Sequence, residues 1–102
     1  MEIPDELLTL VGDPEINKSL PVQFQFEDKE FIVDVMLFLD LDDPENLDSE
    51  NNRIQFARNG EGFVLLADLE TEGLRVMQEE FGDIDYIGVT ILDLLEAKWQ
   101  PA

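Results

Sequence analysis

The stretch Arg53-Ile-Gln-Phe-Ala-Arg-Asn-Gly-Glu-Gly-Phe-Val-Leu-Leu-Ala-Asp-Leu69 decides the fold class. Its first part alternates, because apolar Ile54 and Phe56 are separated by polar residues, and this is the period of a half-buried strand. The turn-forming residues Asn59-Gly60-Glu61-Gly62 follow, and after them comes an apolar run over residues 63–69. The stretch therefore predicts a β-hairpin.

A second hairpin is predicted before it. Val22, Phe24 and Phe26 alternate with polar residues, a polar break follows at 27–30, and the segment from Phe31 to Leu39 is rich in β-branched and aromatic residues. Residues 40–52 are acidic and contain no base, so we expect a solvated loop there. Residues 74–81 fit either period, and we favour a strand that begins at Leu74.

Two helices complete the prediction. A short one is expected from Pro4 to Val11, stopped by Gly12 and Pro14. A longer one is expected near the C-terminus, capped by Asp83 or Asp85 and ended by Pro101, with Trp99 folding back onto the sheet or covering an edge. Its apolar face would hold Ile84, Ile87, Ile91, Leu94 and Leu95.

The expected architecture is thus a single acidic α+β domain over residues 1–102. It has an antiparallel sheet of about four or five strands, with a short N-terminal helix and a longer C-terminal helix. The hydrophobic content of 44%, with seven Phe, is too high for a disordered acidic chain. We expect the seven Phe residues to belong to the core.

Composition excludes much of common enzymology. The chain has neither Cys nor His, so it offers no disulfide, thiolate, imidazole base or ordinary zinc site. Ser19 and Ser49 lie in no nucleophile motif, and 25 acids form carboxylate pairs by chance. In an EF-hand register starting at Asp40, Pro44 and Glu45 fall where a ligand and a glycine are required. We therefore expect neither an enzyme nor a cofactor or metal.

The net charge is the leading functional clue. Six bases against 25 acids leave −19 near pH 7, which repels nucleic acid directly. No basic leader or membrane-spanning run is present, so we expect a cytoplasmic, soluble protein. The acids concentrate in two patches whose members are the expected partner-binding residues: Asp40, Asp42, Asp43, Glu45 and Asp48 in the first, Glu70 and Glu72 in the second.

The sharper interpretation of this charge is a surface that complements a basic partner, for which opposite potentials speed association and acids supply hot spots. The expected partner is a nuclease toxin or another nucleic-acid-binding protein, blocked where phosphates would bind. Two alternatives stay open. Surface acidity can serve general solubility, and the chain can be a structural or regulatory adaptor that binds through a sheet edge or the apolar surface near Trp99.

Residues Asn52 to Glu70, followed by Ile87 to Ala97, resemble the closing part of SMI1/KNR4-type (SUKH) domains. There a strand ending in a small residue, a Gly-containing turn, a hydrophobic strand ending in Asp-Leu and a closing helix with a Leu-Leu pair recur in this order. The resemblance implies an α+β fold. For many bacterial members it also implies an immunity protein that binds and neutralises a toxin, often a nuclease, and it carries no catalytic residue over.

Overall fold

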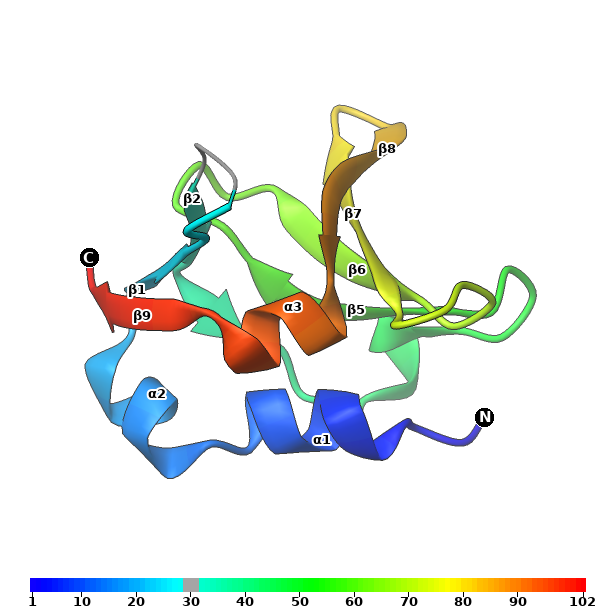
Figure 1. The fold of residues 1–102 in the computed structure, drawn as a ribbon. Helices are drawn as coiled ribbons and strands as arrows, with labels where there is room; N and C mark the ends of the chain where they lie inside the picture. The colour runs from blue at the N-terminus through cyan, green and yellow to red at the C-terminus, as the bar shows by residue number, and fades with distance from the viewer. Residues whose placement is uncertain (29–31) are drawn as a thin grey trace.

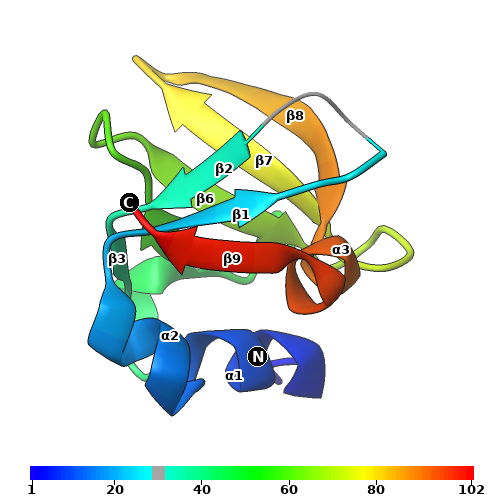
Figure 2. The same cartoon turned by 60° about the vertical axis from the view of Figure 1, so that its left-hand side comes forward.

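The structure is a computed structural model that describes residues 1–28 and 32–102. Within that part the chain forms an α+β fold with two antiparallel sheets and short helices (Figure 1). One sheet has three strands in the order β2-β1-β9. The other has six, in the order β3-β5-β6-β7-β8, with β4 paired to β5. Figure 2 shows the smaller sheet in front of the larger one, with α1 and α2 below both.

The N-terminal segment forms two helices, α1 (Asp5–Val11) and α2 (Pro14–Ser19). The first confirms the predicted short helix. The second was missed because Gly12 and Pro14 were interpreted only as a stop. Pro14 occupies the first turn of α2, where its missing N–H costs nothing, and the Asp13 carboxylate accepts hydrogen bonds from the next two free backbone N–H groups.

The three-stranded sheet pairs β1 (Val22–Gln25) with β2 (Ile32–Val35) on one side and with β9 (Lys98–Pro101) on the other. The predicted first hairpin is thereby confirmed, although Phe31, which should open its second strand, lies outside the described residues. Trp99 lies in the edge strand β9 opposite Phe24, as expected for a residue that covers an edge.

The predicted strand over 31–39 is divided between the two sheets. It leaves the smaller sheet after β2 and enters the larger one at β3 (Leu37–Phe38), with the Met36 N–H donating to the Arg58 carbonyl. A single sheet of four or five strands is therefore wrong. The structure has two sheets, of three and six strands, and residues 32–38 contribute a strand to each. Val35 in β2 and Phe38 in β3 therefore both pack in the same core.

The six-stranded sheet continues through the acid-rich segment. Residues 40–52, expected to be a solvated loop, include the 3-10 helix η1 (Pro44–Asn46) and the short strand β4 (Leu47–Asp48), and Leu41 is buried. The loop prediction is wrong there, because the two apolar residues Leu41 and Leu47 hold the segment against the fold. Then follow β5 (Arg53–Arg58) and β6 (Val64–Asp68), the second predicted hairpin, and β7 (Arg75–Glu80), the favoured strand.

The long C-terminal helix is the clearest error of prediction. Residues Asp83–Thr90 form strand β8, paired with β7, and only Ile91–Glu96 form a helix, α3. Asp83 and Asp85 lie in the strand, and Thr90 caps the helix through a reciprocal pair of hydrogen bonds with Asp93. Isoleucines three and four residues apart fit a helix, but β7 offered this segment an antiparallel strand partner, and tertiary pairing overrides local period.

The core lies between the two sheets and the helices, and α1 packs against α3. Its largest fully buried members come from every layer: Leu7, Leu10, Val22, Phe24, Val35, Ile54, Phe56, Leu65, Val76, Ile91 and Leu94. In the described residues no helix is long and apolar enough to cross a membrane. The helices therefore act as a cover for the sheets, and the sheets' turns carry the exposed charge.

Candidate protein-binding surface

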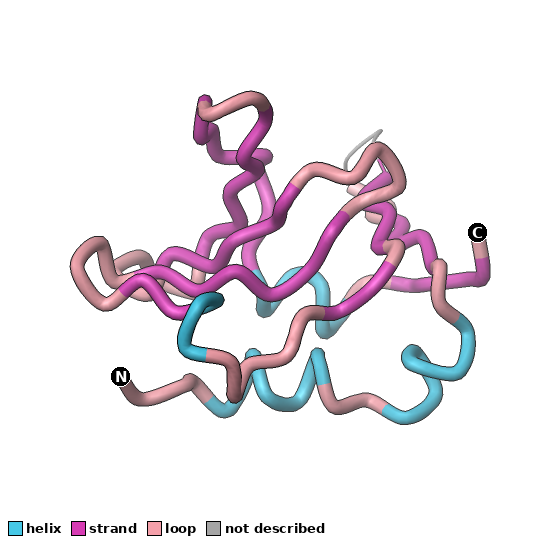
Figure 3. Tube along the Cα trace, turned by 180° about the vertical axis from the view of Figure 1, so that it is seen from behind, coloured by secondary structure: helices cyan, strands magenta, loops and turns pink. Residues whose placement is uncertain are grey.

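The two predicted acidic patches approach each other at one end of the six-stranded sheet. The row Asp48, Arg53, Asp68 and Arg75 crosses four neighbouring strands at this end. The turns at 49–52 and 69–74 follow from it and lie side by side, at the right in Figure 1 and at the left in Figure 3. A hydrogen bond of 3.0 Å from the Leu69 N–H to the carbonyl of residue 52 joins them.

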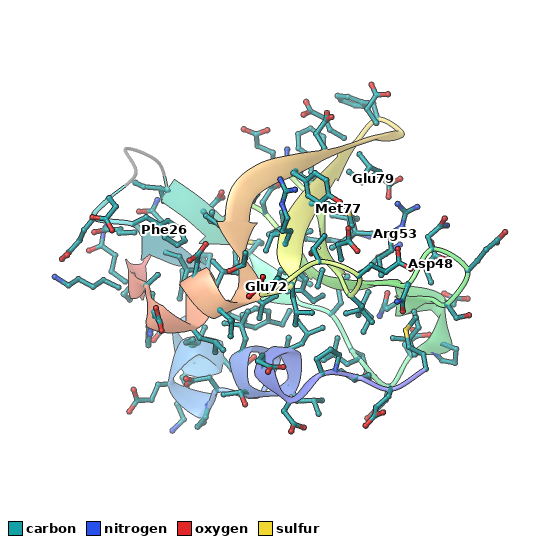
Figure 4. The ribbon with its side chains drawn as sticks, turned by 45° about the vertical axis from the view of Figure 1, so that its right-hand side comes forward. Phe26, Asp48, Arg53, Glu72, Met77 and Glu79 are labelled. Atoms are coloured by element: carbon teal, nitrogen blue, oxygen red, sulfur yellow. The ribbon has the colours of Figure 1, made fainter. Side chains whose placement is uncertain are left out.

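The start of the first patch lies elsewhere. Asp40 and Asp42 border a shallow pocket with Leu8 and Val11, at the C-terminal end of α1. From there the chain passes through η1 to β4 and the end of the sheet. Glu72 is on the α3 side of its turn (Figure 4), where the Leu92 N–H donates to the Gly73 carbonyl. The seven acids thus form a band from α1 to α3 around one end of the sheet.

Three of the seven carboxylates support the local backbone. Asp40 Oδ1 accepts the Asp42 N–H at 2.9 Å, and Asp43 Oδ1 accepts the Glu45 N–H at 3.0 Å. The Asp48 carboxylate accepts two hydrogen bonds from Asn51 and forms an ion pair with Arg53, with 3.1 Å between Asp48 Oδ2 and Arg53 Nε. The Asn51 bonds, and after them the Arg53 guanidinium, hold the pKa of the Asp48 carboxyl below its ordinary value. These acids stabilise turns as well as carrying charge.

The other four carboxylates do not stabilise a turn. Asp42, Glu45, Glu70 and Glu72 are exposed, and their carboxylates make no hydrogen bond or ion pair to any residue that the structure describes. Neutralising them therefore removes charge without removing a turn contact, which makes these four the sharper candidates for partner binding.

The outer face of the six-stranded sheet carries a second, smaller cluster that sequence reasoning missed. Leu66 and Met77 pair across β6 and β7 and are buried, yet they lie outside the main core cluster. Tyr86 is opposite Met77, its ring stacks on the Arg75 guanidinium at 3.7 Å, and its hydroxyl donates to Asp68 Oδ2 at 2.6 Å. Figure 4 shows this side, with Arg53 and Asp48 beside it.

Tyr86 closes this cluster by connecting neighbouring strands. The hydrogen bond to the Asp68 carboxylate raises the pKa of Tyr86 above its ordinary value of 10.0, because ionisation would place two negative charges in contact. Arg75 is held by the ring, and Arg53 by Asp48, so both bases have partners. No local sequence signal could identify this cluster, since its members meet only through strand register.

The tip of the β7–β8 hairpin contradicts one prediction directly. Phe81 was expected in the core, but it is 90% exposed at the tip of a hairpin that projects from the molecule (Figure 1). It forms a two-residue turn with Gly82, between paired Glu80 and Asp83. The signal was present in the sequence as an aromatic followed by glycine inside a run of acids, a turn pattern that was interpreted as a possible helix.

A separate open pocket of about 250 Å³ lies where the end of β1 meets α3. Glu27 and Lys98 form an ion pair at its rim, which lowers the pKa of Glu27 and raises that of Lys98. Asp93 and Glu96 also line it, so it is acidic as well. Among residues 1–28 and 32–102, no three potential metal ligands come together.

Comparisons of the chain with protein-family models, with curated proteins and with solved structures found no match.

Proposed function

We propose that this chain is a small acidic binding protein that neutralises a basic partner in the cytoplasm. The partner class is a nuclease toxin or another nucleic-acid-binding protein, and the chain acts as its immunity protein or inhibitor. Carboxylates on the band would occupy the site where the partner's Lys and Arg bind phosphates. Because no family model matches, the proposal rests on electrostatics and not on the family resemblance.

The observation that carries the proposal is that the carboxylates of Asp42, Glu45, Glu70 and Glu72, around one end of the six-stranded sheet, have no hydrogen-bond or ion-pair partner among the residues that the structure describes. Only two ion pairs, Arg53–Asp48 and Lys98–Glu27, occur among the described residues. Repulsion between so many unpaired charges opposes folding. A basic partner would relieve it, and the opposite potentials would raise the association rate by about 10- to 1,000-fold.

The test is binding of a basic protein captured by the wild-type chain from native lysate at low salt, then purified and identified. The variant Glu45→Gln/Glu70→Gln should slow association by about 3- to 10-fold at low salt. The matched control, Glu15→Gln/Glu96→Gln, removes the same charge away from the band and should retain most of the rate. Stopped-flow measurements of both variants separate local from general electrostatics.

Salt supplies the second readout. Raising ionic strength from about 50 to about 500 mM should weaken the wild-type complex, because screening acts on exposed charges. Capture of no basic protein, or affinity that ignores both salt and the Glu45→Gln/Glu70→Gln variant, would reject the proposal. The latter result would favour the adaptor function instead, for which β9 supplies a free strand edge in the described part of the smaller sheet.

A further inference from the structure

We propose that Phe81 is the apolar anchor through which this protein engages its basic partner, its ring entering an apolar pocket rimmed by Lys or Arg. This inference rests on the proposed function, because the occupant is the same partner. It adds a second contact region, at the far end of β7 from the band of acids. The ring, its backbone conformation and the charges around it each support this role.

The exposure of Phe81 is exceptional for this molecule. The ring is 90% exposed, whereas the next most exposed large apolar side chain in the described part of the chain, that of Ile32, is 53% exposed. Its one described ring contact is an edge-on approach to Phe63, with centroids 5.4 Å apart. Most of the ring surface is therefore open to a partner. An aromatic side chain has few rotatable bonds, so it loses little conformational freedom on binding, as anchors in interfaces require.

The backbone at the tip argues that Phe81 is not there for folding. Phe81 has φ of +51° and Gly82 has φ of +87°, the two positive values of a type I′ hairpin turn. Asn-Gly fits such a turn best, and a bulky residue at the first position is an outlier. The chain thus accepts a strained residue that buries almost none of its surface. Binding gives a physical reason for it, since strained residues gather at functional sites.

The surrounding charge selects the kind of partner. Four acids, Glu79, Glu80, Asp83 and Asp85, lie in the two strands next to the Phe81 turn, and residues 76–89 contain no base. A second copy of this chain, an anionic membrane or a nucleic acid would be repelled there. A protein pocket with an apolar floor and a cationic rim would satisfy both features, because its Lys or Arg groups would meet the carboxylates and stack on the ring.

The deciding variant is Phe81→Asn, because it separates folding from binding. Asn-Gly is the preferred type I′ pair, so the variant should unfold at the same or a higher temperature than the wild type. The probe is the basic protein captured and purified with the wild-type chain. Its affinity for Phe81→Asn should fall at least about 30-fold, the effect of losing one interface hot spot.

Two further variants complete the design. Phe81→Trp keeps an aromatic ring at the tip and should retain binding within about fivefold. Leu95→Ala truncates another exposed apolar side chain, near the C-terminal end of α3, and should leave affinity unchanged. Wild-type affinity in Phe81→Asn overturns this inference but leaves the proposed function in place. If no basic protein binds the wild type, both fall together.

Discussion

Tyr86 shows how one side chain can connect strands that the sequence separates. Its hydroxyl donates to Asp68 on β6 and its ring lies against Arg75 on β7, while the residue itself belongs to β8. The neutral phenol is therefore favoured in the folded protein. Because the folded-state pKa is raised, this contribution is complete below the ordinary value of 10.0 and is lost as pH rises through the higher folded value.

Tyr86 is the only tyrosine of the chain, so tyrosinate absorbance reports on it alone. Its titration midpoint should lie above 10.0 in the folded wild type and move back toward that value in Asp68→Asn. Asn at 68 keeps the oxygen that accepts the Glu70 N–H, so the turn is preserved. Equal midpoints in the two proteins would show that the hydroxyl does not bond Asp68 in solution.

At the scale of elements, the two six-residue helices α2 and α3 both begin at a side-chain cap. The six-residue α3 is far shorter than a helix that is stable alone. The Thr90 hydroxyl accepts the Asp93 N–H and the Asp93 carboxylate accepts the Thr90 N–H, while the Ile91 and Leu92 N–H groups donate to the Leu74 and Gly73 carbonyls. Ile91 and Leu94 then reach the core from its first turns. The cap therefore fixes the positions at which Ile91 and Leu94 enter the hydrophobic core.

Removal of this cap should be measurable. Thr90→Ala should lower the free energy of unfolding by about 1 kcal/mol, because the Asp93 N–H loses its acceptor. Thr90→Ser keeps the hydroxyl and should lose less than half of that. Urea titration followed by far-ultraviolet circular dichroism measures both values. A serine variant as unstable as the alanine variant would assign the effect to the loss of the Thr90 methyl group and not of its hydroxyl.

Elements also show where sequence reasoning succeeded. The hairpins β1–β2 and β5–β6 and helix α1 were predicted, because their periods agree with their tertiary environment. The prediction for residues 83–90 was wrong because the spacing of apolar residues there suits a helix, whereas the segment pairs with strand β7. The acids of the candidate surface could be predicted from the sequence. Which of them support a turn and which lack a partner among the described residues depends on hydrogen bonds that only the structure shows.

For the whole molecule, charge repulsion is the dominant long-range term. A net charge of −19 over 6,125 Å² of surface leaves one uncompensated charge on about every 320 Å². This spacing of about 18 Å exceeds the Debye length of about 8 Å at physiological ionic strength but not the length of about 30 Å at 0.01 M. Folding should therefore be opposed by repulsion mainly at low salt.

Thermal stability should accordingly rise with salt. Between about 10 and about 500 mM sodium chloride the melting temperature should increase, because screening weakens repulsion more than it weakens the few ion pairs. Chloride is preferred to sulfate, which stabilises proteins by exclusion from their surface. The increase should be smaller for Glu15→Gln/Glu96→Gln. A melting temperature that falls with chloride would show that attraction, not repulsion, dominates the surface.

By itself the sequence determined the acidic character, the absence of Cys and His, the α+β class and the hairpins β1–β2 and β5–β6. These properties follow from composition and from the spacing of apolar residues within short segments of the chain. Only the tertiary structure decided that 83–90 is a strand and that two sheets share the segment around Met36. Those outcomes depend on which strand was available to pair, and pairing between strands is set by contacts that local spacing does not contain.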